Sequence, residues 1–164
     1  NLRVDDAREV GADRIVNDVA AIRKYGAPLI VIDFGTATTF NAINEKGEFI
    51  GGAVAPGMRG SLDSLVSGTA KLPRVEIETP KSVIGKNTTT NLQAGLVFGF
   101  AGLVDYIVKK TKREMKLPDI QVVATGGFSG IIAKEVGCID HVDKLLTLQG
   151  LKYLYDLNCS EGKK

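Results

Sequence analysis

The sequence predicts an α/β domain in which helices cover both faces of a mixed β-sheet. Three apolar, strand-like runs follow one another almost without spacers in residues 28–54, and helical and strand-like segments alternate from residue 88 onward. Strands in direct succession pair antiparallel, whereas strands separated by a helix join a sheet in parallel through a crossover. The chain therefore predicts an antiparallel half and a parallel half of one sheet.

The first expected element is a helix over residues 6–25, because apolar residues from Val10 to Ile22 recur at roughly helical spacing. The turn NEKG then joins two strands, and its Gly47 is suited to a positive φ. The three strands expected in this part of the chain cover residues 28–33, 36–44 and 48–54.

The second half begins with an irregular stretch, residues 68–86, which contains Pro73 and Pro80. The order of the elements over the whole chain, with those of the second half given below, is that of a ribonuclease-H-like domain. Such a domain is a three-stranded antiparallel meander continued by parallel strands with helices on both faces. Sugar kinases, actin and the heat-shock chaperones contain such domains. The remaining expected elements are helices over 59–67 and 88–112, a strand over 120–125, a helix ending near 136, a strand over 139–142 and a helix over 146–156.

Composition is that of one ordinary globular domain, with 164 residues, 44% apolar and 24% charged. The net charge of +2 and the scattered lysines give no case for a nucleic-acid partner. Cys138-x-x-His141 is the only metal-like spacing and lacks the two further ligands of a zinc site. We find no signal peptide, and the charge-free part over 94–104 is too short to cross a bilayer, so we expect a cytoplasmic protein without membrane contact.

The stretch VIDFGTATTF, residues 31–40, ends a buried strand with a carboxylate, a glycine and three threonines. Asp33 should emerge at the rim of the sheet, and Gly35 lets the backbone turn tightly and present N–H groups. With the hydroxyl of Thr36, these groups suit a nucleotide phosphate and an associated cation. A plain β-turn with threonines chosen for strand propensity explains the same residues, and the motif alone leaves both interpretations open.

The tetrapeptide GADR, residues 11–14, lies either inside the first expected helix or at its edge. An Asp followed by an Arg is usually an ordinary exposed pair. Gly11 weakens that interpretation, because a glycine in a helix costs about 1 kcal/mol and close approach of a ligand would explain it. Asp13 could serve as a general base and Arg14 as an anion ligand, but the tetrapeptide alone does not establish these roles.

Two further stretches could approach a ligand. In VVATGG, Gly126 and Gly127 follow a strand and precede a helix, which allows close backbone contact with a nucleotide, although a plain strand-to-helix turn also explains them. In IGKNTTTNLQAG, residues 84–95, threonines cap the long helix and leave a positive dipole end that could receive a carboxylate.

Taken together and in order, these motifs resemble the type III pantothenate kinases. The resemblance rests on GADR, DFGTATTF, GGAVAPG, TAKLP, IGKNT, QAG and ATGG, and it covers the chain from Gly11 to about Leu157. Each motif is weak alone, whereas the ordered set is specific.

The resemblance implies an enzyme that transfers the γ-phosphoryl group of ATP to the primary hydroxyl of pantothenate, giving 4'-phosphopantothenate, the first step of coenzyme A synthesis. It makes Asp13 the proton acceptor and assigns to Asp33 a monovalent cation, K⁺ or NH₄⁺, in addition to the Mg²⁺ expected with ATP. It also implies a homodimer. The pantothenate contacts it implies are Gly11, Ala12, Asp13, Arg14 and Thr88, and the nucleotide contacts are Gly35, Thr36, Gly126 and Gly127.

The chain departs from the family pattern in two respects. The family has an N-terminal domain with another phosphate loop of the Asp-x-Gly-Asn-Thr type, and no such stretch occurs here. We therefore expect residues 1–164 to be the C-terminal domain of a longer protein, which also agrees with a start at Asn1, and to phosphorylate pantothenate negligibly alone. In addition, Asn41 stands where the family commonly has Asp. The change weakens cation binding if that position faces the cation, and has no effect if it faces solvent.

Several alternatives stay open at this stage. The long helix carries Gly95, Gly99 and Gly102, which could form the dimer contact or could pack against the domain's own sheet. The chain could also be a non-catalytic, dimerising or regulatory homologue, because some family members carry an accessory-factor label linked to transcription. Another sugar-kinase-like enzyme fits the phosphate turn equally but explains GADR and TAKLP poorly.

Overall fold

The computed structural model describes residues 1–69 and 71–161 and contains a five-stranded mixed sheet. The spatial order is β3-β2-β1-β4-β5, in which β2 is antiparallel to β1 and β3, and β4 is parallel to β1 and β5. This order confirms the predicted ribonuclease-H-like arrangement of a meander continued by parallel strands. The strands are β1 (Leu29–Phe34), β2 (Ala37–Ile43), β3 (Phe49–Pro56), β4 (Gln121–Gly126) and β5 (His141–Val142).

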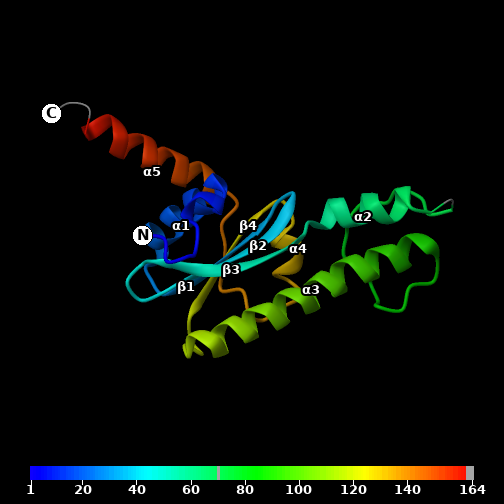
Figure 1. Ribbon diagram of the computed structural model, residues 1–164. Helices are drawn as coiled ribbons and strands as arrows, with labels where there is room; N and C mark the ends of the chain where they lie inside the picture. The colour runs from blue at the N-terminus through cyan, green and yellow to red at the C-terminus, as the bar shows by residue number, and fades with distance from the viewer. Residues whose placement is uncertain (70, 162–164) are drawn as a thin grey trace.

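Helices cover both faces of the sheet (Figure 1). The long helix α3 (Thr88–Met115) lies on one face together with α2 (Met58–Ser67) and α4 (Ser129–Ile132). Helices α1 (Ala12–Tyr25) and α5 (Leu146–Glu161) lie on the other face and pack against each other. We call these the α3 face and the α1 face.

The alternation of side chains along β1 creates two separate cores. Ile30, Ile32 and Phe34 point to the α3 face and join a large apolar cluster, and none of them is more than 2% exposed. Leu29 and Val31 point to the α1 face and belong to a smaller cluster. Asp33 alternates in step with Leu29 and Val31, so its carboxylate points toward α1.

Two predicted helices are shorter than expected. The helix predicted over residues 6–25 is a 3₁₀ turn, η1 (Ala7–Glu9), followed by α1, because Val10 is extended and the chain turns into the helix at Gly11. Asp6 caps the 3₁₀ turn by accepting a hydrogen bond from the backbone N–H of Arg8. The helix expected to end near residue 136 stops at Ile132, the last residue of α4. The break before α1 places the GADR motif at a true helix start.

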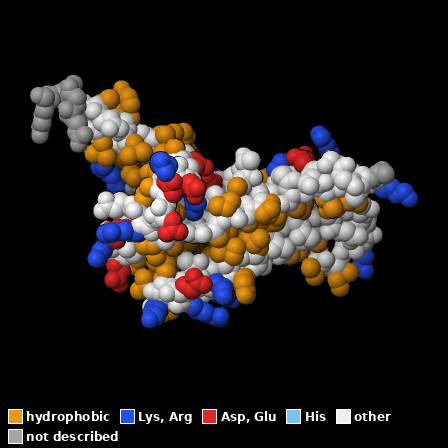
Figure 2. Space-filling view, in the orientation of Figure 1, with side chains coloured by type: hydrophobic (Ala, Val, Ile, Leu, Met, Phe, Trp, Pro, Cys, Tyr) orange, Lys and Arg blue, Asp and Glu red, His pale blue; other side chains and the backbone are white. Residues whose placement is uncertain are grey.

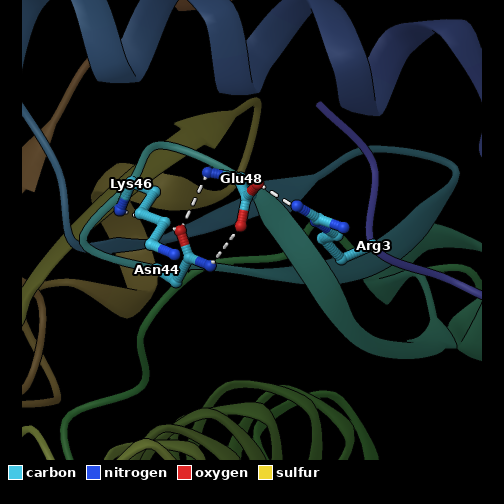
Figure 3. Close-up of polar contacts among 4 residues, drawn as sticks. All are labelled: Arg3, Asn44, Lys46 and Glu48. Atoms are coloured by element: carbon cyan, nitrogen blue, oxygen red, sulfur yellow. Dashed lines mark hydrogen bonds and ion pairs between the residues drawn. The ribbon is translucent and has the colours of Figure 1, made fainter.

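The hairpin between β2 and β3 forms as predicted, with Gly47 at a φ of 71°. Its turn is held by Asn44, whose side-chain oxygen accepts from the backbone N–H groups of Lys46 and Glu48 at 2.9 and 3.0 Å. The Glu48 carboxylate accepts from Asn44 at 2.9 Å and from Arg3 at 3.0 Å (Figure 3). Residues 1–3 thereby lie along the start of β3, at the end of the sheet opposite the Asp33 turn.

The helix α3 is longer than the charge-free run in the sequence. By length and composition alone it could span a membrane, with a mean hydropathy of 1.4 over an 18-residue window. One third of that window is buried inside the domain, and core helices of globular proteins pass the same test. Val97, Val104 and Val108 are fully buried against the sheet. Figure 2 shows acidic and basic side chains interspersed with hydrophobic ones on the face drawn.

Candidate functional site

The candidate site is built around the C-terminal end of β1, where Asp33 leaves the sheet on the α1 face. Asp33 lies opposite Thr39 of β2 and Thr125 of β4 in the strand register. Asn17 of α1 donates a hydrogen bond from Nδ2 to Asp33 Oδ2 at 2.9 Å. In the part of the chain that the structure describes, Oδ1 of Asp33 accepts no hydrogen bond, so this oxygen can accept from or coordinate a ligand.

Glycines bring backbone close to this carboxylate. Gly126 has a φ of 90°, and a Cβ built on it would lie 2.6 Å from the carbonyl oxygen of Phe34 and 2.7 Å from Asp33 Oδ1. Gly57 closes against the carbonyl oxygens of Gly35 and Thr36, where a side chain would also collide. The turn is therefore enclosed by two other segments of backbone. Gly127 shows no such constraint, since nothing lies within 4 Å of a Cβ built on it.

Burial raises the pKa of the Asp33 carboxyl above its usual value. The hydrogen bond from Asn17 acts in the opposite direction, and the negative charge of Asp13 raises the pKa further. A bound cation would offset both unfavourable contributions. Within the described residues, no group of three or more His, Cys, Asp or Glu side chains could hold a metal ion, so most ligands of such a cation would have to be hydroxyl, carbonyl or ligand oxygens.

The GADR motif forms the start of α1, beside this carboxylate. Gly11 is the N-cap residue, and a Cβ built on it would lie 2.6 Å from Asp13 Oδ1. The Asp13 side chain is exposed in the first turn and accepts from the backbone N–H of Arg14 at 2.9 Å. Asp13 lies one helical turn before Asn17, whose side chain donates to Asp33. The start of α1 and the Asp33 turn are therefore joined through Asn17.

Arg14 is held against the sheet by Asn41. Its Nε donates to Asn41 Oδ1 at 2.7 Å, and its Nη2 donates to the carbonyl oxygen of Phe40 at 3.3 Å. The guanidinium also lies 5.0 Å from the centre of the Phe49 ring. Burial lowers the pKa of Arg14, while the charges of Asp18 and Asp13 raise it.

The position of Asn41 fits neither alternative that the sequence left open, namely that it faces the cation or that it faces solvent. It is 2% exposed, so it does not face solvent. It also does not contact Asp33, because its Nδ2 donates to Asp18 Oδ1 at 2.7 Å while its Oδ1 accepts from Arg14. Burial raises the pKa of Asp18 from 3.8 to about 7, against the opposing effects of Asn41 and Arg14.

Sequence reasoning missed Asn17, Asp18 and the link through Asn41. Asn17 is 1% exposed and joins two elements, because it donates to Asp33 and accepts from the hydroxyl of Thr147 in α5 at 2.7 Å. A usable signal was present: Asn17 and Asp18 follow Val16 on the side of α1 that carries the buried Ala20 and Ala21. Polar residues on a buried helix face require partners.

Thr88 is not brought to this site within one chain. It is the first residue of α3, and α3 begins beside α2, at the end of the molecule away from α1 (Figure 1). The predicted threonine cap is also corrected, because Asn87 is the N-cap and exchanges hydrogen bonds with Thr90 in a capping box. Gly35 and Thr36, by contrast, are exposed at the Asp33 turn, and their contact with a nucleotide stays a prediction.

The sheet order and the glycine-enclosed acidic turn define a domain of the ribonuclease-H-like class. The sequence model of the type III pantothenate kinase family matches residues 1–110. A type III pantothenate kinase from Moorella thermoacetica is 55% identical over 157 residues, which cover 96% of this chain and 61% of that protein. The chain belongs to the type III pantothenate kinase family.

The fold is shared with a solved relative. A crystal structure of a protein described as a Baf family transcriptional activator, from Campylobacter jejuni, matches with a TM-score of 0.65 at 21% identity. The match covers 94% of this chain and 67% of that one. The chain spans about 61% of the length of the Moorella relative, and the two comparisons together show the family and the fold.

Proposed function

We propose that the chain is the acceptor-binding, C-terminal part of an enzyme that phosphorylates pantothenate with ATP. Family membership supports this activity. The observation that supports it is the placement of Asp13 and Arg14 in the first turn of α1, one helical turn before Asn17, whose side chain donates to Asp33. Phosphoryl transfer to an alcohol needs positioning, charge neutralisation and a base for the hydroxyl proton, and a carboxylate, a guanidinium and a phosphate-type turn can supply these.

On the acceptor side, Asp13 takes the proton of the pantothenate hydroxyl as that oxygen attacks the γ-phosphorus. Its exposure in the first turn leaves the carboxylate accessible to substrate. Arg14 binds the carboxylate of pantothenate, because only two of its nitrogens are committed to protein partners. Gly11 and Ala12 provide backbone at the same helix start.

On the nucleotide side, the exposed Gly35–Thr36 turn contacts the phosphates, and Gly126 and Gly127 line the adjoining turn after β4. Asp33 holds the monovalent cation, K⁺ or NH₄⁺, through the oxygen that has no protein partner. A cation there, with Mg²⁺ on ATP, supplies neutralisation of phosphate charge.

The nucleotide contacts on this chain form one side of a cleft. We propose that the family's N-terminal domain supplies the other side, so that residues 1–164 constitute one domain of a two-domain enzyme. ATP and pantothenate are then its substrates, and the cytoplasm is its place of action.

A homodimer reconciles Thr88 with the rest of the acceptor site. Among the described residues, nothing beyond their own stretch of α3 lies within 4 Å of a Cβ built on Gly95, Gly99 or Gly102, so these glycines do not pack against the described sheet. Tyr106 continues the same exposed helix face and is 64% exposed. We propose that this face meets a second copy and that the second copy brings its Thr88 to the acceptor site.

The proposal is tested by a coupled assay of pantothenate-dependent ADP formation. The chain joined to the N-terminal domain of its Moorella relative should turn over in K⁺ and much less in Na⁺, whereas the chain alone should show negligible activity. Normal turnover by the chain alone contradicts the two-domain proposal. Absence of turnover in the joined protein favours the non-catalytic, regulatory homologue instead.

A further inference from the structure

Two buried side chains, Asp18 and Asn41, lie behind Arg14 in a hydrogen-bonded network and have no role in the chemistry proposed above. The network runs from Asp18 through Asn41 to Arg14, with hydrogen bonds of 2.7 Å at both links. Asp18 is 5% exposed and Asn41 is 2% exposed, whereas Arg14 reaches the surface. These hydrogen bonds therefore connect the buried carboxyl group of Asp18 to the guanidinium of Arg14, which meets solvent.

The orientation of the Asn41 amide is determined by its two partners. A guanidinium only donates, so the oxygen of Asn41 must face Arg14, and its NH₂ group then points to Asp18 Oδ1, which accepts in either protonation state of the carboxyl. Without an acceptor at Asp18, the NH₂ group would lose its partner and the amide would be free to turn away from Arg14. Because Asp18 and Asn41 are shielded from water, an unmade hydrogen bond between them is costly.

The guanidinium of Arg14 is in turn fixed at three points. Asn41 binds Nε, the carbonyl oxygen of Phe40 binds Nη2, and the Phe49 ring lies beneath the plane. Gly52 leaves room for this arrangement, because a Cβ there would lie 2.9 Å from Nη2. The Nη1 group makes no hydrogen bond to any residue that the structure describes. It is the donor left for a ligand.

We propose that Asp18 and Asn41 are positioning residues for Arg14, holding its guanidinium so that the free Nη1 edge faces the carboxylate of the acceptor substrate. The inference rests on the proposed function, since it takes that acceptor to be pantothenate. Asp18 Oδ2 is buried without a hydrogen-bond partner in the described part of the chain, an unfavourable arrangement that a role in positioning Arg14 explains.

The position can also accommodate the residue common in the family. In Asn41→Asp, a protonated carboxyl would donate to Asp18 and accept from Arg14, so the same geometry is retained. Asn41→Leu removes both links and keeps the number of side-chain heavy atoms. Asp18→Asn keeps the shape but replaces the carboxyl acceptor by an amide that can also turn a donor toward Asn41. These three variants separate the positioning role from simple filling of space.

The test is a double-mutant cycle on kcat/KM for pantothenate, measured in the joined two-domain enzyme. Asn41→Leu should lower kcat/KM about tenfold, through KM rather than kcat, while the KM for ATP stays unchanged. Asn41→Asp should restore most of the loss. In an Arg14→Ala background, neither Asn41→Leu nor Asp18→Asn should have a further effect, because both act through Arg14.

Asp143→Asn is the matched control, since Asp143 is a buried carboxylate, 7% exposed, that binds Lys24 and Tyr25 away from the site. It should lower stability without changing KM. Equal losses from Asn41→Leu with and without Arg14 overturn the inference, and if that variant does not fold, Asp18→Asn provides the same comparison. A wild-type enzyme without pantothenate-dependent turnover overturns the proposed function itself, whereas additive losses in an active enzyme overturn only the positioning role.

Discussion

On the α3 face, β1 contributes Ile30, Ile32 and Phe34 to a continuous apolar core, whereas on the α1 face the same strand contributes Leu29 and Val31 and then ends in Asp33. The helices follow the same division. The buried face of α3 that meets the first core is apolar, while α1 buries two polar side chains among its apolar ones. These buried polar residues of α1 are Asn17 and Asp18.

The two faces differ in how their buried residues affect stability, and the candidate site lies on only one of them. Apolar burial stabilises at roughly 25 cal/mol per Å² without requiring particular partners. Buried polar groups need a partner each, and Asp18 Oδ2 lacks one in the described structure. We therefore expect substitutions on the α3 face to affect mainly stability, and substitutions at the site end of the α1 face to affect mainly function.

The largest stability effect is expected on the α3 face. Phe34→Ala removes a side chain that is 2% exposed in the large core, and it should lower the free energy of unfolding by about 3–5 kcal/mol. Urea titration followed by circular dichroism measures the change. Val54→Ala, at a side chain that is 64% exposed, is the control and should change stability by less than about 0.5 kcal/mol. Similar losses in both variants would show that the two-core description is wrong.

Gly126→Ala should cost about 1–3 kcal/mol of stability and also reduce turnover. The φ of 90° disfavours any side chain, and the new Cβ would press on Phe34 and on Asp33 Oδ1. Gly127→Ala is its neighbour and control, because nothing lies within 4 Å of the added atom and its φ is not positive. Equal tolerance of both substitutions, measured by thermal unfolding, would contradict the enclosed turn.

Asp18 should make stability depend on pH. Burial raises its pKa from 3.8 to about 7, so the folded protein holds a proton that the unfolded chain has lost between these values. Stability attributable to Asp18 is therefore present below pH 4 and falls as pH rises toward 7, by up to about 1.4 kcal/mol per pH unit. Asp18→Asn should remove this slope, and the variant should gain stability relative to wild type as pH rises. Parallel pH profiles for both proteins would refute the assignment.

The smallest effect is expected far from the site, at the hairpin end of the sheet. Arg3 is mostly exposed, and its ion pair with Glu48 should contribute at most about 1 kcal/mol. Glu48 keeps its bond to Asn44 when Arg3 is replaced (Figure 3). Arg3→Ala should leave kcat/KM unchanged and move the unfolding midpoint slightly, with less effect in high salt. A large loss of activity would show that this end of the sheet communicates with the site.

Much of the fold could be predicted because local signals and tertiary packing agree. The meander followed from three adjacent apolar runs, and Gly47 adopts the positive φ that the NEKG turn requires. The helix break at Val10 and Gly11 could not be predicted from spacing, because Val10 itself counts toward the roughly helical spacing of Ile15 and Val19 although its backbone is extended. The backbone there is decided by the cap at Asp6 and by the glycine.

The positions of two motifs on their elements could be predicted, because each motif carries its own local geometry. Asp33 lies near the end of β1 at the rim of the sheet, and GADR lies at the edge of α1. The ligands assigned to both motifs stay predictions. The role of Asn41 could not be predicted, because it depends on which face of β2 meets which face of α1. The distance of Thr88 from Asp13 was equally hidden, since neither motif order nor spacing indicates whether two loops belong to the same end of a domain.

The most direct test of the central claim compares Asp13→Asn with Asp143→Asn in the joined two-domain enzyme. Asp13 lies at the proposed acceptor site, whereas Asp143 is paired with Lys24 elsewhere on the same face. Asp13→Asn should lower kcat for pantothenate phosphorylation by about 10²–10⁴-fold at unchanged stability, whereas Asp143→Asn should lower stability and keep kcat. Normal turnover by Asp13→Asn, or equal losses in both variants, would contradict the assignment of this face as the acceptor site.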